Sequence, residues 1–289
     1  MAISAVQVKE LRDKTGAGMM NCKKALTEAD GNFEKAIEIL RKKGASVAAK
    51  RAERDANEGI VKTKVSDDGK FGVILEVNCE TDFVAKSDDF VNFAEFVLNA
   101  IVSEKPADVE ALKSLTFDGK VVNDELTNIT GKIGEKIEIS RFQLEEGDDL
   151  ALVDYIHHGA KLGVLVKAEN VGNVDYSVLS SVLKDVAMQA AAMKPRFLSV
   201  SEVPNEVIEK EKEIYKEVAK KEGKPDHILD KIADGRLNKF YQEVCLLKQA
   251  YIKENAKTIA DVIAEFNKAN SSEVKLTAFF RYHLSDENK

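Results

Sequence analysis

The feature that most constrains the fold is a unit of two strands and a helix that occurs twice. The first copy contains Phe71-Gly-Val-Ile-Leu-Glu-Val77 and the second contains Leu162-Gly-Val-Leu-Val-Lys-Ala168. In each copy an alternating segment precedes this run (59–65 and 152–157), and a segment with a helical apolar stripe follows it (87–105 and 176–193). Period-two alternation is typical of strands, and spacing of three to four residues is typical of helices. The repeat therefore predicts an α+β core of two duplicated halves.

Residues 1–55 predict a separate bundle of three short helices. The first helix begins at the capping box Ser4-Ala-Val-Gln7 and can end at Gly16. Asn32 is a good cap for the third helix, and Gly44 is expected to lie just beyond its end. Two architectures remain open for this bundle: a ubiquitin-associated-like domain or a helix-turn-helix module.

Residues 202–244 predict an antiparallel helical hairpin that turns at Gly223-Lys-Pro225. The first of its helices carries a thin apolar stripe, made of Val203, Val207, Ile214 and Val218. A strand expected over 274–284 can return to the sheet, which makes the hairpin an insertion. The expected division is an N-terminal domain with its linker over 1–55, a first core half over 56–140, a second core half over 141–201 and 245–289, and the inserted hairpin over 202–244.

Composition is that of a soluble globular protein in a reducing compartment. Of 289 residues, 44% are hydrophobic and 32% are charged, and no apolar run is long enough to cross a bilayer. The opening Met1-Ala-Ile-Ser-Ala-Val6 lacks the pattern of a secretory signal, so a cytoplasmic location without membrane association is expected. Cys22 and Cys79 lie in apolar segments and are expected to be small core residues.

Charge is distributed unevenly along the chain. Residues 1–55 hold 12 Lys/Arg and 8 Asp/Glu, whereas the rest holds 31 and 42. A basic end on an acidic body favours a partner with an acidic or mixed surface. The alternative is that Lys42, Lys43 and Lys50 only solvate a helix and linker. A nucleic-acid-binding protein that uses the basic end as a helix-turn-helix also stays open.

The usual signatures of catalytic and nucleotide sites are absent from the sequence. There is no phosphate-binding P-loop and no dinucleotide-binding glycine motif. None of the four histidines pairs with Cys or Glu at metal-ligand spacing, and no nucleophile stands with a base. We therefore expect no enzyme activity, no metal and no cofactor. An enzyme with an acidic site around Asp82 is the remaining catalytic alternative.

Thr81-Asp-Phe-Val84 lies at the corner between the buried strand and the helix that Ser87 begins. An aromatic beside an acid on a rigid corner is suited to insertion into a partner. The alternative is that Phe83 packs back onto the helix start, as in a hydrophobic staple. The second copy has Asn173-Val-Asp-Tyr176 at this place, which indicates that the fold does not require Thr-Asp-Phe-Val there.

Several stretches together resemble the bacterial translation elongation factor Ts family. They are Thr15-Gly-Ala-Gly-Met-Met-Asn-Cys-Lys-Lys-Ala-Leu26, Gly72-Val-Ile-Leu-Glu-Val-Asn-Cys-Glu-Thr-Asp-Phe-Val-Ala85, His158-Gly-Ala-Lys-Leu-Gly-Val-Leu-Val166 and residues 201–240. The resemblance extends over almost the whole chain. It implies a guanine-nucleotide exchange factor for elongation factor Tu, with a ubiquitin-associated-like domain, two related core halves and an inserted coiled-coil hairpin.

The resemblance also implies roles for individual residues. Asp82 and Phe83, with Thr81 and Val84, would enter the GTPase and dislocate its Mg²⁺. His158 would be a second core contact, although two histidines stand where the family motif has one, so His157 is also a candidate. The remaining implied contacts are an N-terminal docking face of Lys9, Arg12, Met19, Met20 and Lys23, and a minor core contact at Ile133-Gly134.

Two further expectations follow from the resemblance. Some members carry a C-terminal helical module after the last strand. Here the sequence reaches Ser285-Asp-Glu-Asn-Lys289, so contacts made by that module are expected to be missing. For the hairpin over 202–244, three roles stay open: forming a homodimer, docking on the ribosome, or bracing the core.

Overall fold

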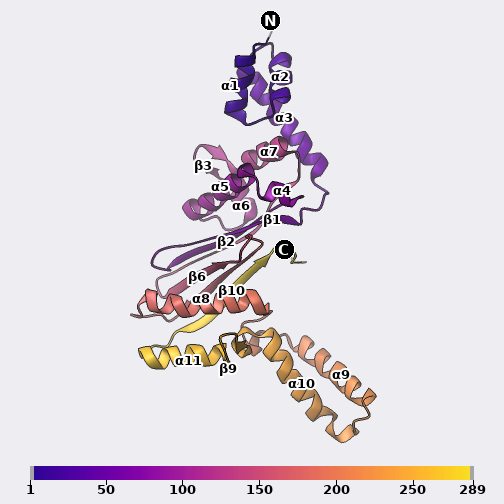
Figure 1. Ribbon diagram of the computed structural model, residues 1–289, viewed down its shortest axis with the longest axis vertical. Helices are drawn as coiled ribbons and strands as arrows, with labels where there is room; N and C mark the ends of the chain where they lie inside the picture. Colours follow the sequence, from indigo (N-terminus) through magenta and orange to yellow (C-terminus); the bar gives the residue numbers. More distant parts are fainter. Residues whose placement is uncertain (1–2, 287–289) are drawn as a thin grey trace.

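The computed structural model describes residues 3–286 and shows an elongated α+β protein, as predicted from the sequence (Figure 1). Three N-terminal helices lie at one end, two stacked sheets with their helices lie in the middle, and a helical hairpin projects at the other end. Expectations that involve residues 1–2 and 287–289 lie outside the described residues.

The core contains two three-stranded antiparallel sheets with the same arrangement. In each, the strand that carries the repeated motif is central, and the strand that precedes it in the chain lies on one side. The first sheet has the order β1-β2-β5, with β1 (Glu58–Val65), β2 (Phe71–Cys79) and β5 (Ile137–Glu146). The second has the order β10-β7-β6, with β6 (Leu150–Ile156), β7 (Leu162–Glu169) and β10 (Lys275–His283).

Helices cover the outer face of each sheet, so the core has four layers (Figure 1). The first sheet packs against α5 (Asp88–Glu104), α6 (Val109–Ser114) and α7 (Val122–Ile133). The second packs against α8 (Tyr176–Met193) and α11 (Ile259–Asn270). Two small hairpins complete the core: β3 (Thr116–Phe117) with β4 (Lys120–Val121), and β8 (Ala250–Tyr251) with β9 (Glu254–Thr258).

Strand β2 is buried on both faces, whereas period-two spacing predicted one buried face. Val73, Leu75 and Val77 face the helices, as expected. Ile74, on the opposite face, packs against the second sheet. The sequence could not show this second contact, because burial on the other face depends on a sheet that lies far along the chain.

The glycines of the repeated motif allow the two sheets to approach each other. A Cβ at Gly72 would lie 3.1 Å from Leu152 Cδ1, and a Cβ at Gly163 would lie 2.5 Å from Val61 Cγ1. The two glycines occupy matching places in the two copies, one residue after Phe71 and one after Leu162. The repeat therefore contains a glycine in each copy, and these glycines are needed because the two copies pack on each other.

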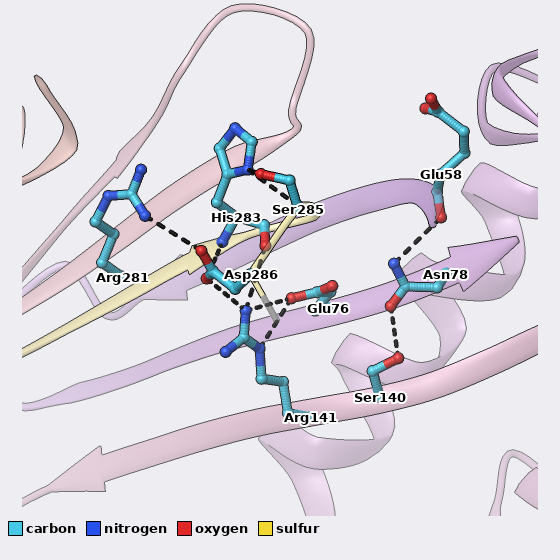
Figure 2. A network of polar contacts seen from close by, with 9 residues as sticks. All are labelled: Glu58, Glu76, Asn78, Ser140, Arg141, Arg281, His283, Ser285 and Asp286. Carbon is cyan, nitrogen blue, oxygen red and sulfur yellow. Dashed lines mark hydrogen bonds and ion pairs between the residues drawn. The ribbon is translucent and has the colours of Figure 1, made fainter. Parts of the chain in front are cut away.

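Charged side chains also connect the two halves near the end of β10 (Figure 2). Arg141 of β5 donates from Nε to the buried Glu76 carboxylate at 2.9 Å. Its terminal nitrogen is 2.9 Å from Asp286 Oδ2, and the guanidinium lies over the Tyr282 ring. Asp286 follows the last strand, so this network fastens the end of β10 to the first half.

The N-terminal bundle consists of α1 (Ala5–Thr15), α2 (Met19–Glu28) and α3 (Phe33–Arg51). The predicted capping box at Ser4 is present, and Gly16 ends α1 with φ 66°. Asn32 caps α3, as predicted. The interior of the bundle includes Leu11, Cys22 and Leu26, all with no exposed surface. Cys79 and Cys245 are likewise buried free thiols.

Gly44 was predicted to lie beyond the end of α3, and this is wrong. The helix continues through it to Arg51. Gly44 instead lies against α7, where a Cβ added to Gly131 would be 2.6 Å from Gly44 Cα. Two glycines therefore allow α3 and α7 to cross at close range, and this crossing joins the bundle to the core.

The predicted hairpin consists of α9 (Asn205–Lys221) and α10 (Leu229–Val244). Short 3₁₀ turns flank its helices: Val200–Glu202, Asp226–Ile228 and Leu246–Lys248. Strand β10 pairs with β7, so the hairpin lies between two strands of one sheet, as expected for an insertion. The predicted stripe is only half correct: Val203 is buried, but Ile214 and Val218 are 43% and 38% exposed. The face of α9 that packs on α10 includes Ala219, which is fully buried near the tip of the hairpin.

Candidate functional site

The corner between β2 and α5 is a single helical turn, α4 (Asp82–Ala85). Thr81 is its cap, and the Thr81 hydroxyl accepts the Val84 N–H at 3.4 Å. Phe83 is 83% exposed, which excludes the staple interpretation, because a staple ring would be covered by the helix start. The corner thus presents an aromatic ring to solvent, where the ring contributes no burial energy to the fold.

Glu135 holds the start of α4 from behind. Its carboxylate accepts the Thr81 N–H at 3.1 Å and the Thr81 hydroxyl at 2.8 Å. Glu135 directly follows Gly134, the residue that ends α7 with φ 82°. The predicted contact at Ile133-Gly134 and the predicted corner at Thr81 therefore meet through one carboxylate.

Glu80 ties the corner to the N-terminal helices. Arg51, the last residue of α3, donates to both Glu80 oxygens at 2.9 Å, and Arg54 lies 3.2 Å away. The Lys136 N–H adds a hydrogen bond at 2.6 Å. Burial alone would raise the pKa of Glu80, but these hydrogen bonds outweigh it, so that the pKa lies below its ordinary value. Glu80 is therefore a charged anchor at neutral pH.

Asp82 is also ionised and partly exposed. Lys86 donates to its Oδ2 at 2.7 Å. This hydrogen bond lowers the pKa of Asp82, and the positive charge of Lys161 lowers it further. A general acid at neutral pH needs a raised pKa, so this carboxylate is poorly suited to the acid catalysis that an acidic enzyme site would use.

A groove of about 700 Å³ brings the corner together with the N-terminal bundle. Arg12 and Met19 line it from the bundle, Phe83 and Val84 from the corner, and Ile133 from the end of α7. Met19 is 58% and Met20 65% exposed, and Lys9 and Lys23 lie on the exposed surface of the same bundle without lining the groove. Residues from three separate segments of the sequence thus form one continuous surface.

The turn between β6 and β7 carries the two histidines. Tyr155 holds His157 through a hydrogen bond of 2.9 Å to Nδ1. The His158 ring is exposed and has no hydrogen-bond partner within residues 3–286. Lys161 of the same turn pairs with Glu58 at 2.6 Å. Glu58 pairs in register with Cys79, two residues before Thr81, so the turn lies close to the corner.

Sequence reasoning missed Glu135, Glu80 and Arg51 as parts of this site. Glu80 lies within the quoted stretch Gly72–Ala85, but no role was predicted for it, and Glu135 and Arg51 are ordinary charged residues beside helix ends. The nearest available signal was Gly134, which predicts a helix end but not which corner that end contacts. Within residues 3–286, no group of three or more His, Cys, Asp or Glu side chains is arranged to hold a metal ion. Over the same range, no helix combines the length and apolarity needed to cross a membrane.

An exposed aromatic on a braced corner, beside two exposed methionines and a basic helix, defines an α+β protein with a surface suited to binding another protein. Residues 80–286 match the family model described as Elongation factor TS. The chain belongs to the elongation factor Ts family, a family of translation elongation factors.

Curated relatives agree over nearly the full length. The chain is 47% identical to elongation factor Ts of Chloroherpeton thalassium over 289 residues, which is 99% of each protein. It is 48% identical to that of Clostridium perfringens strain 13 over 285 residues, 98% of this chain and 93% of the relative. It is 46% identical to that of Chlorobium phaeobacteroides over 286 residues, 98% of each.

Proposed function

We propose that this chain is the guanine-nucleotide exchange factor for elongation factor Tu. It binds the GDP-bound GTPase, promotes release of GDP, and stays bound until GTP binds. The observation that carries this proposal is the exposed Phe83 on a corner that Glu135 and Glu80 brace from behind. A ring held rigidly in solvent is ready to insert without first being ordered, so little of the binding free energy is lost.

In this proposal Thr81, Asp82, Phe83 and Val84 enter the GTPase beside its Mg²⁺. Bound GDP is held by loop amides and by Mg²⁺ that bridges to phosphate oxygens. Inserting an apolar ring and a carboxylate there displaces the surroundings of the metal and weakens both sets of contacts. Asp82 contributes a negative charge that competes with phosphate for positive groups of the partner.

The groove surface supplies the remaining contacts that we propose. Met19 and Met20 are flexible apolar side chains that adapt to a partner surface. Lys9, Arg12 and Lys23 surround them with positive charge, which favours an acidic patch on the GTPase. Ile133, Gly134 and His158 add contacts from the core. We assign the second core contact to His158 rather than to His157, since Tyr155 already holds the His157 ring.

Exchange needs no chemistry of this chain's own. The factor and GDP weaken each other's binding by the same factor, and incoming GTP then expels the factor by the same reciprocity. We therefore propose that the chain is not an enzyme and uses no metal or cofactor. Its partner is a protein in the cytoplasm, not a nucleic acid or a membrane. The helix-turn-helix alternative is disfavoured because α3, which would read the DNA, packs along α7.

We further propose that each of the four predicted segments of the chain has its own role in binding. Residues 1–55 bind the surface of the partner, and residues 56–140 carry the corner that inserts into it. The second core half, residues 141–201 and 245–289, contributes His158. Residues 202–244 form the projecting hairpin.

Ile214 and Val218 leave an apolar strip on this hairpin, which supports a homodimer through it. Replacing both residues with glutamate should convert a dimer into a monomer in sedimentation. An unchanged dimer would instead place the contact elsewhere.

The test of exchange is release of fluorescent GDP from purified elongation factor Tu. The wild-type chain should accelerate release, and Phe83→Ala should reduce that acceleration about 10-fold, as for loss of an aromatic hot spot. Val178→Ala, which truncates a 48% exposed side chain on α8, is the matched control and should have no effect. If the wild-type chain does not accelerate release, the proposal fails.

A further inference from the structure

The outer edge of β10 is uncovered, unlike the outer edge of β6 in the same sheet. On β6, the Leu152 N–H donates to Gly69 O at 2.8 Å, and the Leu152 carbonyl accepts the Tyr176 hydroxyl at 2.8 Å. Along 275–282, pairing with β7 is the only main-chain hydrogen bonding within the described part of the chain. Every second N–H and C=O of an edge strand points outward, so β10 offers a row of unpaired groups.

A cleft of about 750 Å³ follows this open edge. Its wall on one side is the unbroken run of residues 277–282 from β10. The opposite wall comes from the segment that joins α8 to α9, including Lys194, Arg196 and Glu202. Neighbouring side chains of a strand point to opposite faces, so an unbroken run can line a cleft only along the strand edge.

Two polar atoms beside the cleft are buried without a hydrogen-bond partner within residues 3–286. They are Thr277 Oγ1 and Arg281 Nε, and both residues line the cleft. Buried polar atoms in folded proteins nearly always have partners, because leaving one unpaired costs stability. Two such atoms on one strand, beside unpaired main-chain groups, point to a ligand with its own donors and acceptors.

The charge that is free at the cleft is positive. Lys194 and Arg196 are exposed, and neither forms an ion pair within the described residues. The acidic residues are already engaged: Glu202 accepts the Leu198 N–H at 2.8 Å, and Asp286 pairs with Arg141 and Arg281 (Figure 2). At the end of β10, burial lowers the pKa of His283, and the charges of Arg281 and Lys194 contribute to this.

We propose that the cleft binds an acidic extended segment of a partner protein, which adds as a fourth strand beside β10. Main-chain groups of the segment would pair with the open edge, while its acidic side chains face Lys194 and Arg196. This is the β-augmentation mode of peptide recognition. A second copy of this chain fits less well, since pairing two β10 edges would bring two basic rims together. The inference is independent of nucleotide exchange and does not use the corner at Phe83.

The test uses the full chain and fluorescein-labelled peptides of about eight residues that alternate valine with glutamate, a length typical of one strand. Fluorescence anisotropy should show saturable binding of this peptide, and weak or no binding of the peptide with lysine in place of glutamate. Lys194→Glu combined with Arg196→Glu should weaken binding about 10-fold or more. Lys221→Glu with Lys239→Glu makes the same change of charge on exposed residues of the hairpin and should leave binding unchanged.

A second pair of peptides separates strand addition from simple charge attraction. Each carries N-methyl groups on alternate residues, one set on the amides of one edge and one set on the amides of the other. Only one of the two should lose binding, because only one edge of the peptide faces β10. Equal binding of both N-methylated peptides, or of the acidic and basic peptides, would overturn the proposal. A dimer of the chain that the acidic peptide dissociates would overturn it in favour of a second copy.

Discussion

Glu135 accepts two hydrogen bonds from Thr81, one from the main-chain N–H at 3.1 Å and one from the hydroxyl at 2.8 Å. The two residues are 54 positions apart in the chain. One lies at the end of α7 and the other at the start of α4. This contact fixes the direction in which the corner carrying Phe83 projects.

Replacing Glu135 with alanine should slow nucleotide exchange by several-fold and should also lower the free energy of unfolding. Losing two hydrogen bonds to a carboxylate costs about 1–3 kcal/mol, and α4 is then free to reorient. Glu138→Ala, on the neighbouring strand, is the control, because within residues 3–286 its carboxylate pairs only with the side chain of Lys136, at 3.0 Å. Hydrogen exchange at the Thr81 and Val84 amides should speed up in the Glu135 variant alone, and unchanged protection there would contradict the assignment.

Phe83→Ala should leave the free energy of unfolding within about 0.5 kcal/mol of wild type, as for most surface substitutions. The ring is 83% exposed, so its removal creates no cavity. Phe90→Ala is the contrasting variant, since Phe90 is fully buried and its loss should cost about 3–5 kcal/mol. Urea unfolding measures both. A loss of several kcal/mol in Phe83→Ala would mean that the ring packs after all.

Gly131→Ala should destabilise the protein by about 1–3 kcal/mol, the cost typical of overpacking. The added methyl would lie 2.6 Å from Gly44 Cα, so the α3–α7 crossing has to open. The matched control is Gly235→Ala in α10, where an added Cβ meets nothing within 4 Å. That change should stabilise the protein by about 0.5–1 kcal/mol, because alanine is the better helix former. Thermal unfolding of the two variants should therefore shift in opposite directions.

Stability should fall at acidic pH partly through Glu80. Its pKa is lower in the folded protein than the ordinary value of 4.5, so the folded state favours the charged form. The stabilisation is complete above about pH 5 and is lost as the pH falls through the folded pKa, below 4.5. Glu80→Gln should be less stable than wild type at pH 7, and the difference should shrink as the pH falls below 4. Urea midpoints at pH 7 and pH 3 measure this, and a constant difference would contradict it.

The parts of the fold that could be predicted are those with local causes. The capping box at Ser4 and the α8 span from Tyr176 to Met193 depend on contacts within a few residues, and both are confirmed. Gly44 shows where prediction from local sequence fails. A glycine after an apolar stripe usually marks a helix end, but the alanine-rich residues that follow continue α3, and the close contact with Gly131 comes from a distant helix.

The site divides in the same way. The position of Phe83 at a corner could be predicted from the strand before it and the helix after it. Its exposure could not, because a staple contact and a free ring have the same local sequence. Glu135 and Arg51 act on the corner from 54 and about 30 positions away, and nothing near them in sequence indicates which residue they contact. The sequence shows which side chain is unusual, whereas the structure shows what supports it.

The hydrogen bonds that hold Thr81 limit how well a short peptide could imitate the corner. A short synthetic copy of residues 80–85 would contain the ring and the acid but neither Glu135 nor Arg51, since these come from other parts of the chain. Such a peptide would become ordered only when it binds the partner. The conformational entropy lost in that step would remove most of its affinity. The activity of the corner is therefore a property of the assembled core, and a compound meant to imitate it would need a rigid scaffold of its own.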